Sequence, residues 1–191
     1  ADIRVGILTF RERWQLIFQS AVYSLTEEYL QTYSPALMAH EYLYINSRLL
    51  PSEEIIHSIQ KLADKEAILF NDELIAIKTN QVLTFPIEIN QLKECNFIPA
   101  HSFVRLLQYA FDIVKWNGEM IRHDFEFLTK GRKSAPLSAT NSVSGSEYIF
   151  VEEGAVVEDC ILNAKDGPIY IGKNSLMMEG SMIRGSFAML E

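Results

Sequence analysis

Apolar residues recur every six positions in the last part of the chain. The members of this set, with two extra residues between the second and the third, are Val151, Val157, Ile171, Met177, Ile183 and Met189. A period of six fits neither a helix nor a single strand, and it is typical of a coiled solenoid. In a left-handed parallel β-helix, each hexad forms one short strand and a corner, and three hexads close one turn. Residues 147–191 are therefore predicted to form the first coils of such a helix.

The position two places before each inward residue lies at a tight corner, where a small side chain is expected. Ala155, Ser175 and Ser181 fit this rule, whereas Ile161 and Phe187 do not. The pattern runs to Met189 without a capping helix, although an open coil needs a cap or a neighbour. Together with a start at Ala1, this predicts a fragment cut in mid-repeat.

The front half shows helical spacing in several places. Apolar residues three and four apart predict an amphipathic helix over residues 3–18. A short helix is expected from Thr26 to Tyr33. The sequence Pro51-Ser52-Glu53-Glu54 begins another helix, with an apolar inner face. That face consists of Ile55, Ile59 and Leu62.

Two further helices are expected towards residue 131. One runs from Phe103 to Val114 and stops before Trp116-Asn117-Gly118. Asp124 then caps a last helix, Phe125 to Lys130, which Gly131 ends.

Strand patterns alternate with these helices. Residues 42–45 predict an aromatic-rich strand, and residues 67–78 predict a β-hairpin with Asn71-Asp72 at its turn. Alternating strands and helices favour an α/β domain, and the hairpin favours a mixed sheet. The composition shifts to Ser, Thr, Ala and Asn after Lys133. We therefore predict an α/β domain over 1–133, a linker over 134–146 and the coil over 147–191.

Charge and composition narrow the class of protein. The net charge of −8 disfavours a broad nucleic-acid surface, because phosphate binding needs an excess of Lys and Arg. The chain carries no apolar run long enough to cross a membrane. Two cysteines, Cys95 and Cys160, are too few for a disulfide framework and favour a reducing compartment. A cytoplasmic protein that binds neither nucleic acid nor membrane is expected.

The sequence contains no self-sufficient catalytic motif, and no residue is assigned as a metal ligand. The four histidines, His40, His57, His101 and His123, are scattered and are expected to be structural or exposed. The predicted strand 42–45 ends in Asn46-Ser47-Arg48. Polar residues after a strand can face a ligand crevice, so Asn46 and Arg48 are binding candidates, and a plain turn is the alternative.

A second group of polar residues surrounds the predicted last helix. Its members are Asp124, Glu126, Lys130, Arg132 and Lys133. Carboxylates and cations together suit Mg²⁺ and phosphate, but such a mixture also forms self-compensating solvated surfaces. Arg4 is a further candidate phosphate contact. Lys173 and Arg184 are expected on outer faces of the coil.

Four blocks of this sequence resemble one bacterial family. They are Ala1-Asp2-Ile3-Arg4-Val5-Gly6-Ile7-Leu8-Thr9 with Arg11-Glu12-Arg13-Trp14; Leu43 to Pro51, with Ser47 where Gly is expected; Asp124-Phe125 and Thr129 to Ser134; and Gly167 to Lys173 with Met178 to Ser181 and Ile183-Arg184-Gly185. The family is that of sugar nucleotidyltransferases similar to the bifunctional N-acetylglucosamine-1-phosphate uridyltransferase/glucosamine-1-phosphate acetyltransferase. The likeness spans nearly the whole chain.

The resemblance implies a mixed-sheet nucleotidyltransferase-like domain that joins a nucleoside triphosphate to a sugar 1-phosphate and releases pyrophosphate, with Mg²⁺ as cofactor. The substrate-binding candidates chosen from the residues above all lie within the first three of these blocks; they are Arg4, Asn46, Arg48, Asp124, Lys130 and Arg132. The coil would be the acyltransferase-like half and a trimerisation element, so a homo-oligomer is expected. The Gly-rich nucleotide loop and the later coils of such enzymes are missing here, which predicts an incomplete active site.

Two alternatives stay open at the level of the sequence. The first is a hexapeptide-repeat acyltransferase whose α/β domain is not catalytic. The second is a non-enzymatic scaffold in which the coil only assembles trimers.

Overall fold

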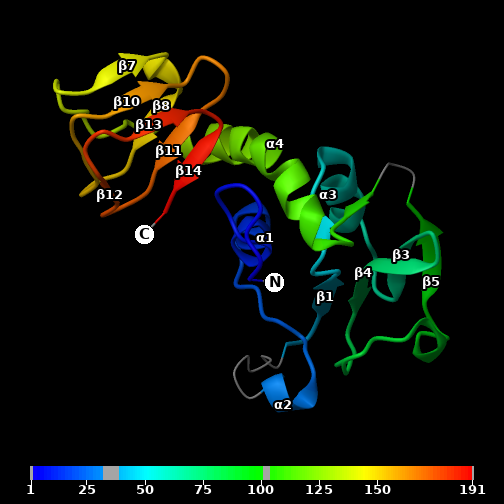
Figure 1. Cartoon of the computed structure of the whole chain (residues 1–191). Coiled ribbons are helices and arrows are strands. Elements are labelled where there is room, and N and C mark those ends of the chain that lie inside the picture. The colour runs from blue at the N-terminus through cyan, green and yellow to red at the C-terminus, as the bar shows by residue number, and fades with distance from the viewer. Residues whose placement is uncertain (1, 32–38, 101–103, 191) are drawn as a thin grey trace. The chain divides into compact units, whose positions relative to one another are not determined.

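A computed structural model describes residues 2–31, 39–100 and 104–190 of the chain (Figure 1). The chain divides into two compact units. Unit 1 consists of Ala1–Asp2 and Phe10–Gln108, and unit 2 consists of Ile3–Thr9 and Tyr109–Glu191. The boundaries at 133 and 146 stay a prediction, and a short strand, β7 (Ser142–Ser144), lies within the expected linker.

Unit 1 is built around a mixed four-stranded sheet with the order β1-β4-β3-β5. The strands are β1 (Tyr42–Ile45), β3 (Glu66–Phe70), β4 (Glu73–Thr79) and β5 (Asn96–Pro99). β4 pairs antiparallel with β1 and β3, whereas β5 pairs parallel with β3. A separate antiparallel pair joins β2 (Leu49–Leu50) to β6 (Arg105–Leu106). The predicted α/β class is confirmed, and the sheet is mixed.

Alternation along the strands gives this sheet two apolar faces. Ile68 and Ala76, which pair across β3 and β4, contribute to a buried cluster with Ile55 and Ile59 of helix α3 (Glu53–Gln60). The neighbouring pair, Ala67 and Ile77, points to the opposite face and packs with Leu92. Because successive side chains of a strand point to opposite sides, one strand serves both clusters.

Two elements of unit 1 form where their local signals predict them. Ser52 caps α3, and its hydroxyl accepts a hydrogen bond of 3.3 Å from the amide of Ile55. The hairpin turn places Asn71 and Asp72 at positive φ, 49° and 59°. Asn and Asp tolerate this backbone region better than most residues, so the dipeptide suits the turn.

The helix expected over residues 3–18 is wrong in its first half. Helix α1 runs only from Phe10 to Phe18. Residues 3–9 form a tight loop in unit 2 instead, with a bridge between Arg4 and Thr9 and with Gly6 at φ +88°. Helix α2 spans Glu28–Gln31, and the predicted end at Tyr33 lies outside the described residues.

The two helices expected between residues 103 and 130 are one helix, α4 (Ala110–Thr129). It continues through Gly118, whose cost of about 1 kcal/mol does not stop a helix that tertiary packing holds. Asp124 therefore lies inside the helix and does not cap it. The helix begins where the amide of Tyr109 donates to Asp112 Oδ2 at 2.9 Å. Phe103, the predicted start, lies outside the described residues, and Gly131 follows the helix at φ +72°, as expected.

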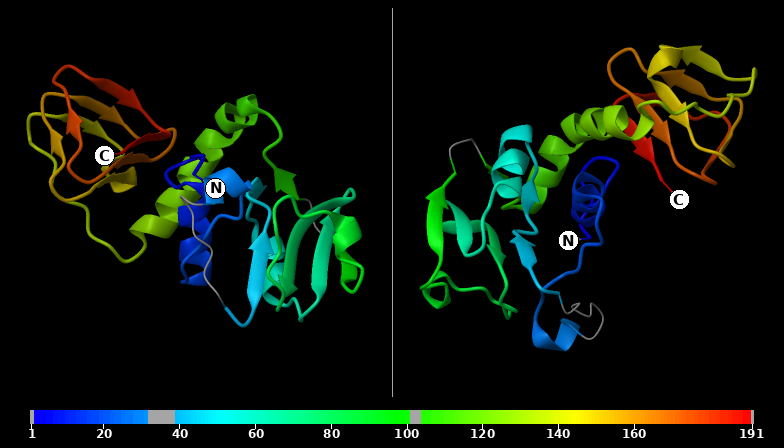
Figure 2. Two further views of the ribbon diagram at one scale, coloured as in Figure 1. Left: turned by 90° about the horizontal axis from the view of Figure 1, so that it is seen from below. Right: turned by 180° about the vertical axis from the view of Figure 1, so that it is seen from behind.

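The remainder of unit 2 consists of short parallel strands that rotate through three sheets (Figure 2). The strands are β7 (Ser142–Ser144), β8 (Ile149–Val151), β9 (Val156–Val157), β10 (Ile161–Asn163), β11 (Ile169–Ile171), β12 (Leu176–Met177), β13 (Met182–Arg184) and β14 (Phe187–Met189). The sheets have the orders β13-β10-β7, β14-β11-β8 and β12-β9. Each strand from β7 to β11 therefore pairs with the strand that comes three places later in the chain, as β7 does with β10 and β10 with β13.

The apolar hexad positions lie in the interior of these sheets. Val151, Val157, Ile171 and Met177 are buried in one cluster, against which Ile183 and Met189 pack. The two large residues at predicted corner positions instead occupy strand ends, in β10 and β14. Because Ile161 and Phe187 begin strands and do not lie at corners, the expectation of a small side chain does not apply to them.

The segment before β7 closes the start of this arrangement. The amide of Ala135 donates to the carbonyl of Val151 at 2.8 Å. The side chain of Asn141 donates to the carbonyl of Val157 at 2.7 Å and accepts from the amide of Cys160 at 2.9 Å. One side-chain amide thus satisfies two backbone groups of the first turn.

Among the helices in the described parts of the chain, none combines the length and apolarity that crossing a bilayer would need.

Candidate functional site

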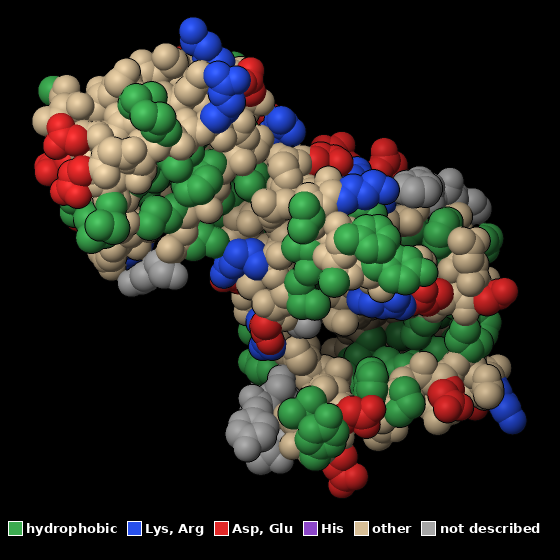
Figure 3. Space-filling view, in the orientation of Figure 1, with side chains coloured by type: hydrophobic (Ala, Val, Ile, Leu, Met, Phe, Trp, Pro, Cys, Tyr) green, Lys and Arg blue, Asp and Glu red, His purple; other side chains and the backbone are tan. Residues whose placement is uncertain are grey.

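The sequence-predicted residues fall into both units. Asn46 and Arg48 belong to unit 1, and the other four, Arg4, Asp124, Lys130 and Arg132, belong to unit 2. In the space-filling view of Figure 3, Lys and Arg side chains are dispersed over the visible face and do not gather in a single patch.

Asn46 organises the turn that follows β1. Its amide donates to the carbonyl of Ile75 at 2.8 Å, and its Oδ1 accepts from the amide of Arg48 at 3.0 Å. Its Nδ2 donates to the carbonyl of Leu74 at 3.0 Å and to Glu73 Oε1 at 3.1 Å. Every polar atom of this side chain is therefore engaged within the turn, and the geometry favours a turn-forming role for Asn46.

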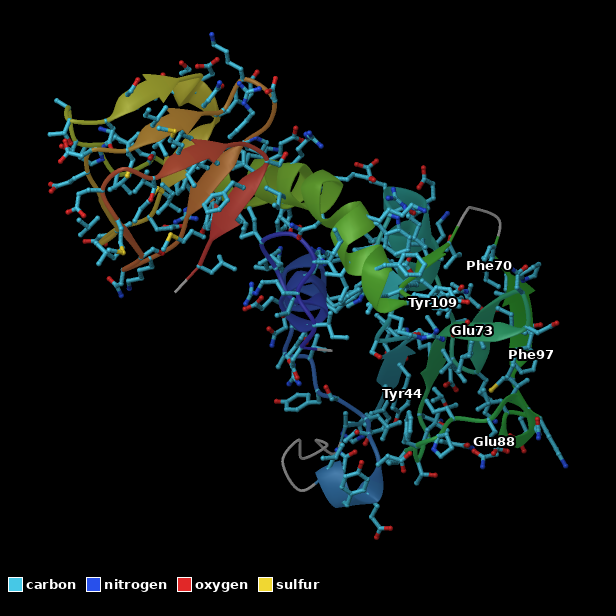
Figure 4. The ribbon with its side chains drawn as sticks, in the orientation of Figure 1. Tyr44, Phe70, Glu73, Glu88, Phe97 and Tyr109 are labelled. Carbon is cyan, nitrogen blue, oxygen red and sulfur yellow. The ribbon has the colours of Figure 1, made fainter. Side chains whose placement is uncertain are left out.

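Arg48 forms an ion pair with Glu73, which begins β4 and is labelled in Figure 4 together with Tyr44 of β1. The two side chains are 43% and 30% exposed. An anion would have to compete with this carboxylate to bind the guanidinium. Chemically, the site is a partly neutralised cation at the edge of a turn.

In unit 2, the buried carboxylate of Asp124 holds the loop of residues 3–9. Its Oδ2 accepts hydrogen bonds from the amides of Ile7, at 2.9 Å, and Leu8, at 3.1 Å. The amide of Gly6 donates to Oδ1 of Asn117 at 2.9 Å. Three consecutive backbone amides therefore converge on one face of α4, an arrangement that suits a negative charge.

Arg4 lies on the outer side of the same loop. Its guanidinium donates through Nη1 to the carbonyl of Ile7, and the residue is exposed. This position leaves a charged group at the surface while its direction is fixed by the loop.

Arg132, just after α4, meets the outer face of β8 and β11. Its Nη2 pairs with Glu152 Oε2 at 2.6 Å, and its guanidinium lies 5.0 Å from the ring centroid of Phe150. The hydroxyl of Tyr170 donates to Glu152 Oε1 at 2.5 Å. The rings of Phe150 and Tyr170 stack with their centroids 6.0 Å apart.

These contacts shift the pKa values of all three ionisable groups. The hydrogen bond from Arg132 is the main cause that lowers the pKa of Glu152, and the same bond raises the pKa of Arg132. Burial, followed by the hydrogen bond to Glu152, raises the pKa of Tyr170 to about 12. At neutral pH, Arg132 and Glu152 are therefore both charged and form an ion pair, whereas Tyr170 is neutral.

Lys130, Lys133 and Glu126 extend from the same end of α4 and are exposed. Lys130 is the C-cap residue that follows Thr129, the last residue of α4. An exposed ammonium after the last helical turn is accessible to an anion.

Within residues 2–31, 39–100 and 104–190, no group of three His, Cys, Asp or Glu side chains is placed to hold a metal ion. Asp124, the buried carboxylate of the predicted Mg²⁺ cluster, is tied to two backbone amides. Nδ1 of His123 lies 3.8 Å from Oδ1 of Asp124, and His101 lies outside the described residues.

Sequence reasoning missed the partners of the predicted cations. Phe150 and Tyr170 are directly paired in register across β8 and β11, twenty residues apart. The strand repeat was a usable signal for this pair, because residues one turn apart stack on the same face. For Glu73 and Glu152, no signal of comparable strength exists, since a charged residue in a strand has many equivalent neighbours.

A family model described as sugar nucleotidyl transferase matches residues 1–133. The matched range includes the loop of residues 3–9, all of unit 1 and α4. The chain belongs to the sugar nucleotidyl transferase family. All six predicted binding residues lie within the range that the family model matches. Searches of curated proteins and of solved structures returned no match to this chain. Membership of this family implies a nucleotide and a sugar phosphate as substrates.

Proposed function

We propose that the protein transfers a nucleotidyl group from a nucleoside triphosphate to a sugar 1-phosphate, giving a nucleoside diphosphate sugar and pyrophosphate. The family match over residues 1–133 is the observation that carries this proposal. A phosphate oxygen of the sugar 1-phosphate attacks the α-phosphorus of the triphosphate. The bond between that phosphorus and the bridging oxygen breaks, and pyrophosphate leaves.

Catalysis of this kind depends on positioning and on neutralising negative charge. In the proposal, Arg4 and Lys130 bind phosphate oxygens because both are exposed cations. Within unit 2, Arg132 is paired with Glu152 and contributes charge after the end of α4. Arg48 of unit 1, which is paired with Glu73, is a separate candidate contact. Asn46 orders the turn that carries Arg48.

Mg²⁺ is retained in the proposal as a requirement of the substrate. Among the described residues, no group of three His, Cys, Asp or Glu side chains could hold the ion. Mg²⁺ usually binds through nucleotide phosphates and one or two carboxylates.

The decisive experiment measures pyrophosphate release by the full-length protein. It combines several nucleoside triphosphates with several sugar 1-phosphates, each with and without Mg²⁺. Release with at least one pair supports the proposal, and no release with any pair contradicts it.

A pair of variants relates the activity to the loop cation. Arg4→Ala is expected to raise KM for the phosphate substrate about 10-fold, the value of one lost charge-assisted hydrogen bond. Lys165→Ala, an exposed cation of unit 2 outside the proposed site, should leave KM unchanged. Equal effects of the two substitutions on KM would show that Arg4 is not part of the site.

We further propose that strands β7 to β14 form a left-handed parallel β-helix and that the protein is a trimer. The rotation of parallel strands through three sheets supports the β-helix, and the trimer rests on the family resemblance alone. This rotation also favours a second candidate function, acyl transfer by the coil beside a non-catalytic α/β domain, as in the bifunctional family that the sequence resembles. Acetyl transfer from acetyl-coenzyme A to a sugar phosphate, without pyrophosphate release, would support that candidate.

The oligomeric state needs its own measurement. Light scattering after size exclusion should give the mass of three chains. A trimer without either activity would favour the scaffold alternative.

A further inference from the structure

Asp124 is an ionisable side chain buried inside a helix, at 1% exposure. Burying a carboxylate costs free energy unless hydrogen bonds compensate it. Here the amides of Ile7 and Leu8 supply two of them. The interaction joins residues more than a hundred positions apart in the sequence, so it constrains the loop and not only the helix.

The shape of the loop is matched to this carboxylate. A Cβ atom added to Gly6 would lie 2.5 Å from Asp124 Oδ2 and 2.8 Å from Met120 Cβ. Gly6 also has φ +88°, a region that other residues rarely adopt. Only glycine lets the loop approach α4 this closely.

A second side chain of the helix grips the same loop. Asn117 lies seven residues before Asp124, two helical turns away and hence on the same face. Its Oδ1 accepts a hydrogen bond from the backbone amide of Gly6, the residue before the two whose amides donate to Asp124. The path of the chain from Gly6 to Leu8 is therefore fixed by side chains of α4.

The exposed guanidinium of Arg4 depends on this path. It donates to the carbonyl of Ile7, the residue whose amide Asp124 accepts. The bridge between Arg4 and Thr9 closes the loop on its other side. Ile7 thus links the buried carboxylate to the exposed cation through a single residue.

We propose that Asp124 is a positioning residue that sets the direction of Arg4 towards a phosphate group of the substrate, and that it does not itself bind substrate or metal. The link to substrate rests on the proposed function. Direct binding by Asp124 would require its carboxylate to leave two backbone amides and reach the surface.

The first test is independent of the reaction. In the full-length protein labelled with ¹⁵N, amide exchange of Ile7 and Leu8 and the Nε–H signal of Arg4 are followed by NMR. Asp124→Ala should speed exchange of both amides at least 10-fold and broaden or shift the Arg4 signal. Asp124→Asn, which keeps one acceptor oxygen, should show a smaller change. Asp159→Asn, an exposed aspartate of the same unit, serves as the control.

The second test measures pyrophosphate affinity by calorimetry. Arg4→Ala and Asp124→Ala should each weaken binding about 10-fold, and the double variant should be no weaker than Arg4→Ala alone. Residues that act through one another show this non-additivity. A purely structural role of Asp124 would lower the fraction of folded protein and leave the affinity of that fraction unchanged.

The outcomes separate the two proposals. Unchanged amide exchange and an unchanged Arg4 signal in Asp124→Ala overturn the positioning role. Additive losses of affinity also overturn it, because they show that Asp124 acts on the ligand separately from Arg4. If the wild-type protein binds no pyrophosphate while the NMR changes occur, the proposed function fails, and Asp124 is confirmed only as the residue that positions Arg4.

Discussion

Unit 2 holds two carboxylates in opposite ways. Asp124 is buried inside α4 and bound by backbone amides of the loop 3–9. Glu152 lies on a face of the strand array, where the side chains of Arg132 and Tyr170 bind it. Every residue except proline keeps its backbone N–H donor, so the first arrangement depends little on the side chains of the loop and fixes the course of the chain. The second joins side chains after the backbone is already placed, and we expect it to matter less for stability.

Removal of the buried carboxylate should have the largest effect. Asp124→Ala leaves two backbone amides without an acceptor, each at a cost of about 1–3 kcal/mol, so a loss of about 3 kcal/mol in unfolding free energy is expected. Urea denaturation of the variant against Asp159→Asn measures it. A loss no larger than that of the control would show that the buried carboxylate does not hold the loop.

Crowding the loop should have the next largest effect. Gly6→Ala forces a Cβ against Asp124 and imposes positive φ on a residue that disfavours it, at a cost of about 2 kcal/mol. Gly118→Ala is the matched control, because nothing lies within 4 Å of its added Cβ. That control should stabilise the helix by about 0.5–1 kcal/mol. Destabilisation by both variants to the same degree would show that the loop does not require glycine.

The pair on the strand face should contribute less. A double-mutant cycle with Arg132→Ala and Glu152→Gln is expected to give about 1 kcal/mol of coupling, since the Arg132 side chain is 47% exposed and solvent screens it. A coupling as large as the effect of Asp124→Ala would show that the Arg132–Glu152 pair stabilises the fold as much as the buried carboxylate does.

The same pair gives a sign for its pH dependence. The pKa of Glu152 lies below its ordinary value of 4.5 in the folded protein. Its contribution is therefore complete above that value and is lost as the pH falls through the lower, folded-state pKa. Denaturation at a series of acidic pH values should show this loss in the wild type and not in Glu152→Gln.

The smallest effect concerns the tyrosine that completes the cluster. Spectrophotometric titration should show Tyr170 ionising near a pKa of about 12. Glu152→Gln should lower this pKa only in part, because burial is the larger cause of the shift. Tyr170→Phe identifies the signal by its loss. A return to the ordinary value of 10.0 in Glu152→Gln would show that the carboxylate, and not burial, dominates.

The elements that the sequence predicts well carry their own local signals. Ser52 determines where α3 begins, and Asn71-Asp72 determines the hairpin turn. Both act within a few residues, so they are visible without knowledge of the fold. The six-residue repeat is likewise visible, because each turn of strands reuses one pattern of buried residues.

The errors arise where distant contacts override local patterns. Residues 3–9 have helical spacing, but the amides of Gly6 and Ile7 donate to the side chains of Asn117 and Asp124 and not to carbonyls within a helix. Gly118 looks like a helix end, although α4 is held by packing of Ile121 and Phe125 against Phe150 and Tyr170. For the candidate site, the sequence could name Arg4 and Asp124 as polar residues of interest. It could not show that both are connected through Ile7, because that link depends on the folded path of the loop.

Asn141 has a consequence for association between molecules. An uncovered strand edge can template pairing with another chain. At the first turn, the side chain of Asn141 satisfies the carbonyl of Val157 and the amide of Cys160, two groups that a foreign strand would otherwise bind. A single asparagine thus disfavours pairing with another chain at the beginning of the strand array, although no additional strand covers these two groups.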